Sequence, residues 1–285
     1  MPRKPALLTS QIAHGAVFDI YVDDGFVLTE FASIVDILRI ANRIGARSLF
    51  SWNCVSGSGG NKQSSSGAVI ETAPYSRGAK ADYLFALGNR DVAHIDPGLG
   101  HAISQCRHRG AKVFLLAEAA SWFMRQSGDQ AGVHTTHWEN RLVLSETLDA
   151  SDWGAQLARQ SGDIVTCAGM GSTIDVMLAL LAEHLPLASV RTIADIMLHD
   201  KIRDLATVQP FGGQLMGTTG DAGLDRSVAL MQDNIEEPLP IAEIGRLAGL
   251  SARSLERKFK ARLNATPNGY YRMLRLTKAS SLIHN

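Results

Sequence analysis

The sequence predicts an α/β domain with a mostly parallel sheet, followed by a small all-α domain. Roughly the first 200 residues alternate short β-rich runs with helical patterns, which is typical of a parallel sheet covered on both faces. The alternation fails between Asp200 and Gly223, where Pro210 and five glycines occur, and helical spacing then resumes. At 285 residues the chain is also long enough for two domains of roughly 150 residues each.

The first strand and the first helix are predicted near the start of the α/β region. Ala16 to Val22 is a short β-rich run. Phe26 to Ile44 follows as a helix, because its apolar residues recur at three- and four-residue intervals and would form one buried face. These apolar residues are Phe31, Ile34, Val35, Leu38 and Ala41.

Four further apolar runs predict further strands. They are Trp52 to Ser56, Tyr83 to Leu87, Lys112 to Leu116 and Asp163 to Cys167. The second and third runs are apolar enough to be central strands, which are buried on both faces. The Gly- and Ser-rich stretch from Ser56 to Gly67 predicts a hairpin or a loop.

Two helices are predicted to complete the α/β region. Ser172 to Glu183 carries one apolar stripe, formed by Ile174, Met177, Leu178 and Leu181. After Pro186, helical spacing resumes from Ala188 to His199. Its inward residues are expected to be Val190, Ile193, Ile196 and Met197.

We place the α/β domain at residues 10–203, a linker at 204–223 and the all-α domain at 224–285. The formal net charge of zero conceals an uneven distribution along this chain. Up to Leu224 there are 18 basic and 22 acidic residues, whereas after it there are 10 basic and 6 acidic ones. The basic C-terminal region predicts a surface that meets a polyanion.

Composition excludes several classes of protein. The three cysteines are widely scattered, so they predict neither a disulfide framework nor a metal site. No stretch approaches about 18 consecutive apolar residues, and no phosphate-binding glycine fingerprint occurs. We therefore expect a cytoplasmic protein without a membrane partner, a metal or a cofactor.

The C-terminal region has the pattern of a helix-turn-helix. A short helix is predicted at Asp225 to Asn234, and a second helix bears the apolar residues Leu239, Ile241, Ile244, Leu247 and Ala248. Gly249 should end that second helix, and Ser251 can cap a third. Leu255, Phe259 and Leu263 are assigned to the core, which leaves the other side of the third helix cationic and suited to the major groove of DNA.

This segment resembles the first helix-turn-helix and connecting helix of AraC/XylS transcription regulators. The matching residues include Ala248, Ser251, Arg253, Leu255, Arg257, Phe259, Pro267, Tyr271, Arg275, Leu276 and Ala279. The resemblance implies that Arg253, Glu256 and Arg257 contact base edges of double-stranded DNA, and that Ser251, Lys260 and Arg262 contact phosphates. An ion pair of Arg257 with Glu243 or Glu256 is the alternative. Members of that family carry a second helix-turn-helix after the connecting helix. On the basis of the resemblance, we expect that this second motif is missing here.

The α/β region resembles the PfpI-like, class I glutamine amidotransferase-like domain of GlxA-type regulators, which has a flavodoxin-like sandwich fold. The matching segments are FASIVDILRIANR, LFALGN, THWE and TCAGMGSTIDVMLALL. The last two are similar to a subgroup that senses quaternary amines or basic amino acids, such as glycine betaine, carnitine or arginine. The resemblance therefore implies a small-molecule effector.

Enzymes of that superfamily carry a nucleophilic cysteine on a sharp turn after a strand. Counting back from His137 with the family spacing places this elbow at Ala117, whose methyl group cannot attack a carbonyl. We therefore predict no enzyme activity and no catalytic residue. Glu30 matches the acidic residue that supports the elbow in the enzymes. Cys167, with His137 as its base, is the alternative nucleophile, and burial as a small apolar residue is the competing interpretation.

The elbow region is predicted to bind a cationic effector. Loops that follow parallel strands converge at one edge of a sheet, and two carboxylates with two indoles suit a cation there. The predicted effector residues are Glu30, Ala117, Glu118, Trp122, His137 and Trp138. Each tryptophan could instead belong to the core or to a dimer interface, and His137 could pack against its neighbour.

The sequence thus predicts an effector-responsive transcription regulator that dimerises through its first domain. Two alternatives come from other classes of protein. One is a thiol-dependent amidase or glyoxalase-like enzyme that uses Cys167. The other is an interaction protein that has lost DNA binding.

Overall fold

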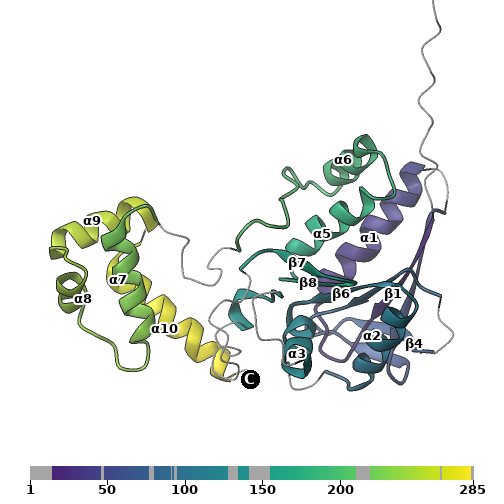
Figure 1. Cartoon of the computed structure of the whole chain (residues 1–285), viewed down its shortest axis with the longest axis horizontal. Coiled ribbons are helices and arrows are strands. Elements are labelled where there is room, and N and C mark those ends of the chain that lie inside the picture. The colour runs from purple at the N-terminus through teal and green to yellow at the C-terminus, as the bar shows by residue number, and fades with distance from the viewer. Residues whose placement is uncertain are drawn as a thin grey trace, which may run out of the picture.

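The computed structural model describes residues 15–45, 48–76, 80–90, 92, 95–127, 134–140, 155–209, 219–263 and 265–283. These residues form an α/β domain and an all-α domain (Figure 1). The predicted fold class is confirmed. Within the described ranges, no helix is both long enough and apolar enough to cross a membrane.

The α/β domain is built on one mixed sheet. Its strands are β1 (Ala16–Tyr21), β2 (Phe50–Ser56), β3 (Gly60–Gln63), β4 (Val69–Pro74), β5 (Tyr83–Ala86), β6 (Lys112–Leu116), β7 (Ala158–Ser161) and β8 (Ile164–Cys167). The order across the described sheet is β3-β4-β2-β1-β5-β6-β8-β7. The two edge pairs, β3 with β4 and β7 with β8, are antiparallel, and the other pairs are parallel.

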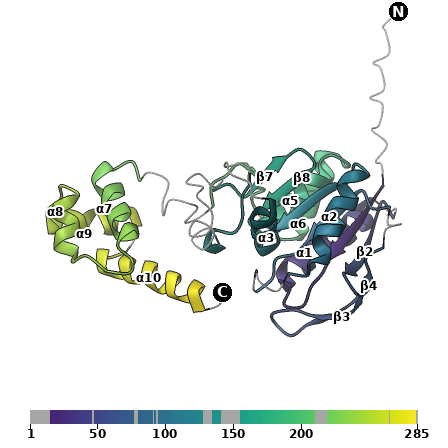
Figure 2. The same ribbon diagram turned by 60° about the horizontal axis from the view of Figure 1, so that its bottom comes forward.

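Helices cover both faces of this sheet. They are α1 (Leu28–Gly45), α2 (Gly98–His108), α3 (Ala117–Ser127), α5 (Ser172–Leu181) and α6 (Leu187–Ile196). One apolar cluster joins α1, α5 and α6 to one face of the sheet, and a second joins α2 and α3 to the other (Figures 1 and 2). The carboxyl ends of the parallel strands therefore meet at one edge, between the two helical layers.

The predicted strands and helices lie where the apolar patterns put them, within two or three residues at each end. The prediction for Ile196 is wrong, because its side chain is 41% exposed. Ile196 is the last residue of α6, and the chain turns away at Leu198, whose φ is +53°. The following residue, Met197, packs against the core instead.

The segment expected to be a linker is partly folded. Leu205 packs on the first apolar cluster, Val208 forms a β-bridge with Gln156, and Gln209 is buried. At its other end, Asp221 caps the first helix of the all-α domain by accepting a hydrogen bond from the Leu224 N–H at 3.1 Å. Residues 210–218 lie outside the described ranges.

The all-α domain consists of α7 (Ala222–Asp233), α8 (Ile241–Leu247), α9 (Ala252–Leu263) and α10 (Pro267–Ile283). Its core includes Leu255 and Phe259, both fully buried, with Phe259 edge-on to Tyr270. Gly249 ends α8 with a φ of +71°, a conformation that glycine adopts at little cost. Ser251 Oγ accepts a hydrogen bond from the Ser254 N–H at 3.2 Å, so it caps α9 as predicted.

Candidate functional site

The exposed side of α9 gathers four of the predicted DNA-binding residues. At 100° per residue, the positions of these four fall within about a third of the helix circumference. They are Arg253, Glu256, Arg257 and Lys260, and all four are exposed. Leu255 and Phe259 point to the opposite side, into the core, so the core fixes which face of α9 is presented.

The two other predicted DNA-binding residues lie apart from this face. Arg262 is exposed but follows Arg253 by nine residues, which corresponds to half a turn around the helix. Ser251 lies at the N-terminus of α9, where its hydroxyl caps the helix. Lys258 is paired with Asp221 and ties α9 to the start of α7. Lys258 therefore supports the position of the helix.

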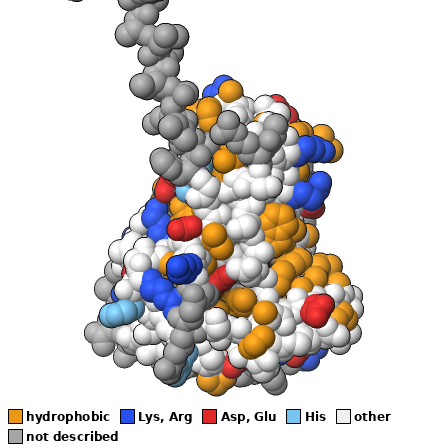
Figure 3. All heavy atoms as spheres, turned by 90° about the vertical axis from the view of Figure 1, so that its right-hand side faces the viewer, with side chains coloured by type: hydrophobic (Ala, Val, Ile, Leu, Met, Phe, Trp, Pro, Cys, Tyr) orange, Lys and Arg blue, Asp and Glu red, His pale blue; other side chains and the backbone are white. Residues whose placement is uncertain are grey.

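The ion pair considered for Arg257 does not form within the described residues. Glu243 lies 3.5 Å from the Arg246 guanidinium instead, and Glu256 is exposed. The guanidinium of Arg257 is thus available to an external acceptor. By contrast, on the face drawn in Figure 3 the Lys and Arg side chains lie scattered among acidic and hydrophobic ones.

A strained turn lies between β6 and α3. Ala117 is the first residue of α3 and has a φ of +42°, a left-handed conformation that non-glycine residues seldom adopt. Its side chain is buried, and its Cβ lies close to two backbone turns, at Gly88 and Gly169. This is the sharp elbow expected at Ala117, with a methyl group in the place of a reactive side chain.

Glu30 lies beside this elbow and is fully buried. Its Oε2 accepts a hydrogen bond from the Gly88 N–H at 2.7 Å, and its Oε1 accepts one from the Met170 N–H at 2.9 Å. Burial raises the pKa of Glu30 to about 8, although these two hydrogen bonds favour the ionised form. Burial and the two hydrogen bonds thus act on the pKa of Glu30 in opposite directions.

Glu118 is the second carboxylate at the elbow. Its Oε2 accepts from the Asn89 N–H and its Oε1 from the Asn140 side-chain amide, both at 3.0 Å. Burial raises the pKa of Glu118, while the bond from Asn140 and the nearby His137 lower it. The structure thus brings together Glu30, Ala117, Glu118 and His137.

The two predicted tryptophans have different surroundings. Trp138 is half-buried next to His137, with ring centroids 5.6 Å apart. Trp122 packs with the apolar cluster under α2, and its ring lies against Gly100. Trp138 is therefore on the segment that reaches Glu118, whereas Trp122 lies with the core beneath α2.

Cys167, the alternative nucleophile, is fully buried. Burial and the nearby Glu30 raise the pKa of its thiol far above the ordinary value, so the thiolate is disfavoured. His137 instead lies with its Nδ1 3.4 Å from Glu139 Oε2. These surroundings correspond to the interpretation of Cys167 as a small apolar residue.

Two buried polar residues were missed by the sequence analysis. Asp175 on α5 accepts hydrogen bonds from the guanidinium and the backbone N–H of Arg203, and lies 2.9 Å from His199 Nε2. Gln209 donates to the carbonyls of Thr136 and Gln156 and accepts from the Trp138 N–H. An acid inside the apolar stretch IDVMLALL was the available signal for Asp175, whereas Gln209 had none.

No family model matches the chain. GbdR from Pseudomonas aeruginosa, an HTH-type transcriptional regulator, is 27% identical over 262 residues, covering 91% of this chain and 71% of GbdR. GlxA from Rhizobium meliloti, also an HTH-type transcriptional regulator, is 28% identical over 268 residues, covering 90% of this chain and 81% of GlxA. Along most of its length the chain is thus similar to HTH-type transcriptional regulators, GlxA among them.

Solved structures show the fold of the α/β domain. An AraC family transcriptional regulator from Pseudomonas putida superposes with a TM-score of 0.55 at 21% identity, covering 64% of this chain and 99% of the other. A ThiJ/PfpI family protein from Pseudomonas syringae has a TM-score of 0.51 at 17% identity, covering 88% and 98%. The relatives support DNA-binding transcription regulation.

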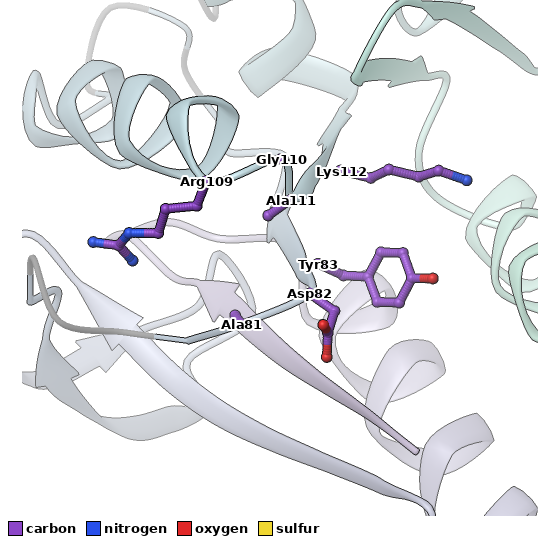
Figure 4. Close-up of a pocket in the computed structure, with 7 residues that line it drawn as sticks. All are labelled: Ala81, Asp82, Tyr83, Arg109, Gly110, Ala111 and Lys112. Carbon is purple, nitrogen blue, oxygen red and sulfur yellow. The ribbon is translucent and has the colours of Figure 1, made fainter. Parts of the chain in front are cut away.

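A polar cavity of about 260 Å³ lies at the opposite edge of the sheet from the elbow. Asp82 and Lys112, at the starts of β5 and β6, contribute to it, and Figure 4 shows Arg109 and Lys112 extending in opposite directions. Lys112 is paired with Glu183 at 3.0 Å, and Asp82 accepts from the Val17 N–H at 2.8 Å. Asp82 and Lys112 of this cavity therefore already have partners within the described residues.

Proposed function

We propose that the chain is an effector-responsive transcription regulator whose α9 reads DNA in the major groove. The exposed face of α9 is the observation that carries the proposal. Arg253 and Arg257 can each donate two hydrogen bonds to guanine, and Glu256 can accept from cytosine. Lys260, on the same face, would contact a phosphate. We also propose a division into the two domains predicted at 10–203 and 224–285, with the packed residues up to Gln209 added to the first and the start of α7 at Ala222 added to the second.

The test is fluorescence anisotropy with DNA from upstream of the chain's own and neighbouring genes, at two salt concentrations. Arg253→Ala/Arg257→Ala should weaken specific binding by about 2 kcal/mol or more, which is at least 30-fold in Kd. Arg43→Ala/Arg125→Ala removes the same charge from exposed sites on the α/β domain and serves as the control. Equal binding by all three proteins would overturn the proposal.

We propose that the α/β domain binds a small cationic effector at the elbow. Glu118 and His137 lie together there, Trp138 adjoins them, and Glu30 lies beneath Ala117. A trimethylammonium or guanidinium group would favour the ionised carboxylates and gain roughly 0.5 to 2 kcal/mol from an aromatic face. The absence of a nucleophile at Ala117 and the burial of Cys167 support binding without catalysis.

Glycine betaine, carnitine and arginine are suitable probes for this site. Calorimetric titration should detect binding of at least one of them to the full chain and at least tenfold weaker binding to Glu118→Gln. Glu183→Gln is the matched control, because Glu183 pairs with Lys112 at the other edge of the sheet. Unchanged affinity in Glu118→Gln would remove the elbow from the proposal.

We propose that the segment from His134 to Asn140 couples this site to the DNA-binding domain. Within this segment Asn140 donates to Glu118, the Trp138 N–H donates to Gln209, and the Thr136 carbonyl accepts from Gln209. Gln209 is the last described residue before the connection to α7. Gln209→Ala should therefore keep effector affinity but lose the effect of effector on DNA binding. An unchanged effector response in that variant would exclude this route.

A further inference from the structure

The outer face of α6 carries a stripe that the proposed function does not explain. The helix packs over α1 and α5 and is the outermost helix on that side of the sheet (Figure 1). Leu187 and Leu198, at the two ends of the stripe, are 68% and 87% exposed. Arg191 and Asp195 lie between them and are also exposed. Helical geometry puts the three helix residues Leu187, Arg191 and Asp195 within about 80° of one another.

The two charged side chains of this stripe have no partner within the described residues. No side-chain hydrogen bond or ion pair of Arg191 or Asp195 occurs there. They are four residues apart, but the basic residue precedes the acidic one, which is the less favourable order for a pair within a helix. A cation and an anion are therefore both presented outward, next to exposed leucines.

The stripe is complementary to itself. If two copies of α6 pack antiparallel about a two-fold axis beside Ile193, Arg191 meets the partner's Asp195, and the reciprocal pair forms at the same time. Leu187 then lies near the partner's Leu198. A parallel arrangement would instead place like charges against each other, which disfavours association. Closed two-fold symmetry is the commonest form of soluble homo-oligomer.

We infer that α6 is a homodimerisation surface that binds α6 of a second copy of this chain in the antiparallel orientation. The inference gives a surface to the dimerisation that the sequence predicts for the first domain, and it depends on neither DNA nor effector. One helical face is small beside the 1,200 to 2,000 Å² that a stable interface typically buries. The expected dimer therefore has a Kd in the micromolar range.

Sedimentation equilibrium of the full chain, over a hundredfold range of micromolar concentrations and without DNA or effector, tests this surface. The unchanged chain should dimerise. Arg191→Asp and Asp195→Arg each create two like-charge contacts across the axis, so each should raise the dimer Kd at least tenfold. Arg43→Asp on α1 is the control for a change of net charge and should leave the Kd unchanged.

An equimolar mixture of the two single variants provides the sharper test. In the mixed dimer, residues 191 and 195 carry opposite charges at both contacts, so dimers should reappear with a Kd within a few-fold of the unchanged chain. Arg191→Asp/Asp195→Arg alone should also dimerise. A monomeric unchanged chain, unaffected single variants, or no recovery in the mixture would each overturn the antiparallel α6 dimer. Circular dichroism confirms that every variant is folded.

Discussion

Glu30 Oε1 accepts a hydrogen bond from the backbone N–H of Met170 at 2.9 Å, although 140 residues separate them. The other oxygen of the same carboxyl group binds the Gly88 N–H. One side chain from α1 thus joins the turn after β5 to the turn after β8, directly beside Ala117. The packing of the turn at Ala117 therefore depends on the buried carboxyl group of Glu30.

Stability should depend on the ionisation of Glu30. The pKa of Glu30 is about 8 in the folded chain, against an ordinary value of 4.5. Between these pH values the folded chain therefore binds more protons at this carboxyl group than the unfolded chain does. The free energy of unfolding should therefore fall as pH rises, by up to about 1.4 kcal/mol per pH unit, and level off above pH 8. Glu30→Gln removes this contribution.

Urea unfolding of Glu30→Gln and of the unchanged chain, at several pH values between 5 and 9, measures this contribution of Glu30 to stability. The stability of Glu30→Gln relative to the unchanged chain should rise with pH up to about 8, whatever its absolute value. Parallel pH profiles for the two proteins would contradict a raised pKa at Glu30.

Two glycines in the turn after β8 should differ in how much their replacement by alanine lowers stability. Gly169 has a φ of +75°, and an added Cβ would overlap Glu30 Oε1 and lie 2.8 Å from the Ala117 Cβ. An added Cβ at Gly171 meets nothing within 4 Å. Gly169→Ala should therefore lower the free energy of unfolding by about 2 kcal/mol or more, whereas Gly171→Ala should change it by less than about 1 kcal/mol. Thermal unfolding of the pair checks this, and equal losses would contradict the packed elbow.

Cys167 should be unreactive in the folded chain. Its thiol is fully buried and its pKa is raised by burial and by Glu30, whereas Cys54 is partly exposed. Iodoacetamide near neutral pH should therefore modify Cys54 first and Cys167 only after unfolding. Site-resolved mass spectrometry measures both. Rapid labelling of native Cys167, with a hydrolytic turnover lost in Cys167→Ala, would favour the thiol enzyme.

Lys260 and Arg262 lie on different sides of α9, so their replacement should affect DNA binding differently. Lys260 shares the face of Arg253, so Lys260→Ala should weaken binding to all sequences about equally and reduce the slope of log Kd against log salt by about 1. Arg262 lies half a turn away, so Arg262→Ala should change neither quantity. Anisotropy at several salt concentrations measures both, and an effect from Arg262 equal to that from Lys260 would show a wider contact surface.

The sequence by itself determined five of the strands described, most of the helices described and the exposed, cationic side of α9, whereas β3, β4 and β7 were not predicted as strands. Central parallel strands such as Lys112–Leu116 are buried on both faces, so they leave a continuous apolar run in the sequence. The cationic face of α9 is equally visible, because Leu255 and Phe259 must be buried and helical periodicity then places Arg253 and Arg257 outside. The elbow at Ala117, where the left-handed turn occurs, was placed by counting from His137 with the spacing of the family that the region resembles.

Only the tertiary structure decided how polar groups are paired over long separations. Glu30 with Met170, Asp175 with Arg203 and Gln209 with Trp138 are hydrogen-bonded pairs that no local periodicity encodes. Ile196 fits a helical stripe in sequence but is exposed, because α6 ends there. Apolar burial repeats along a helix or strand and is legible in one dimension, whereas a buried polar group takes whichever partner the completed fold brings to it.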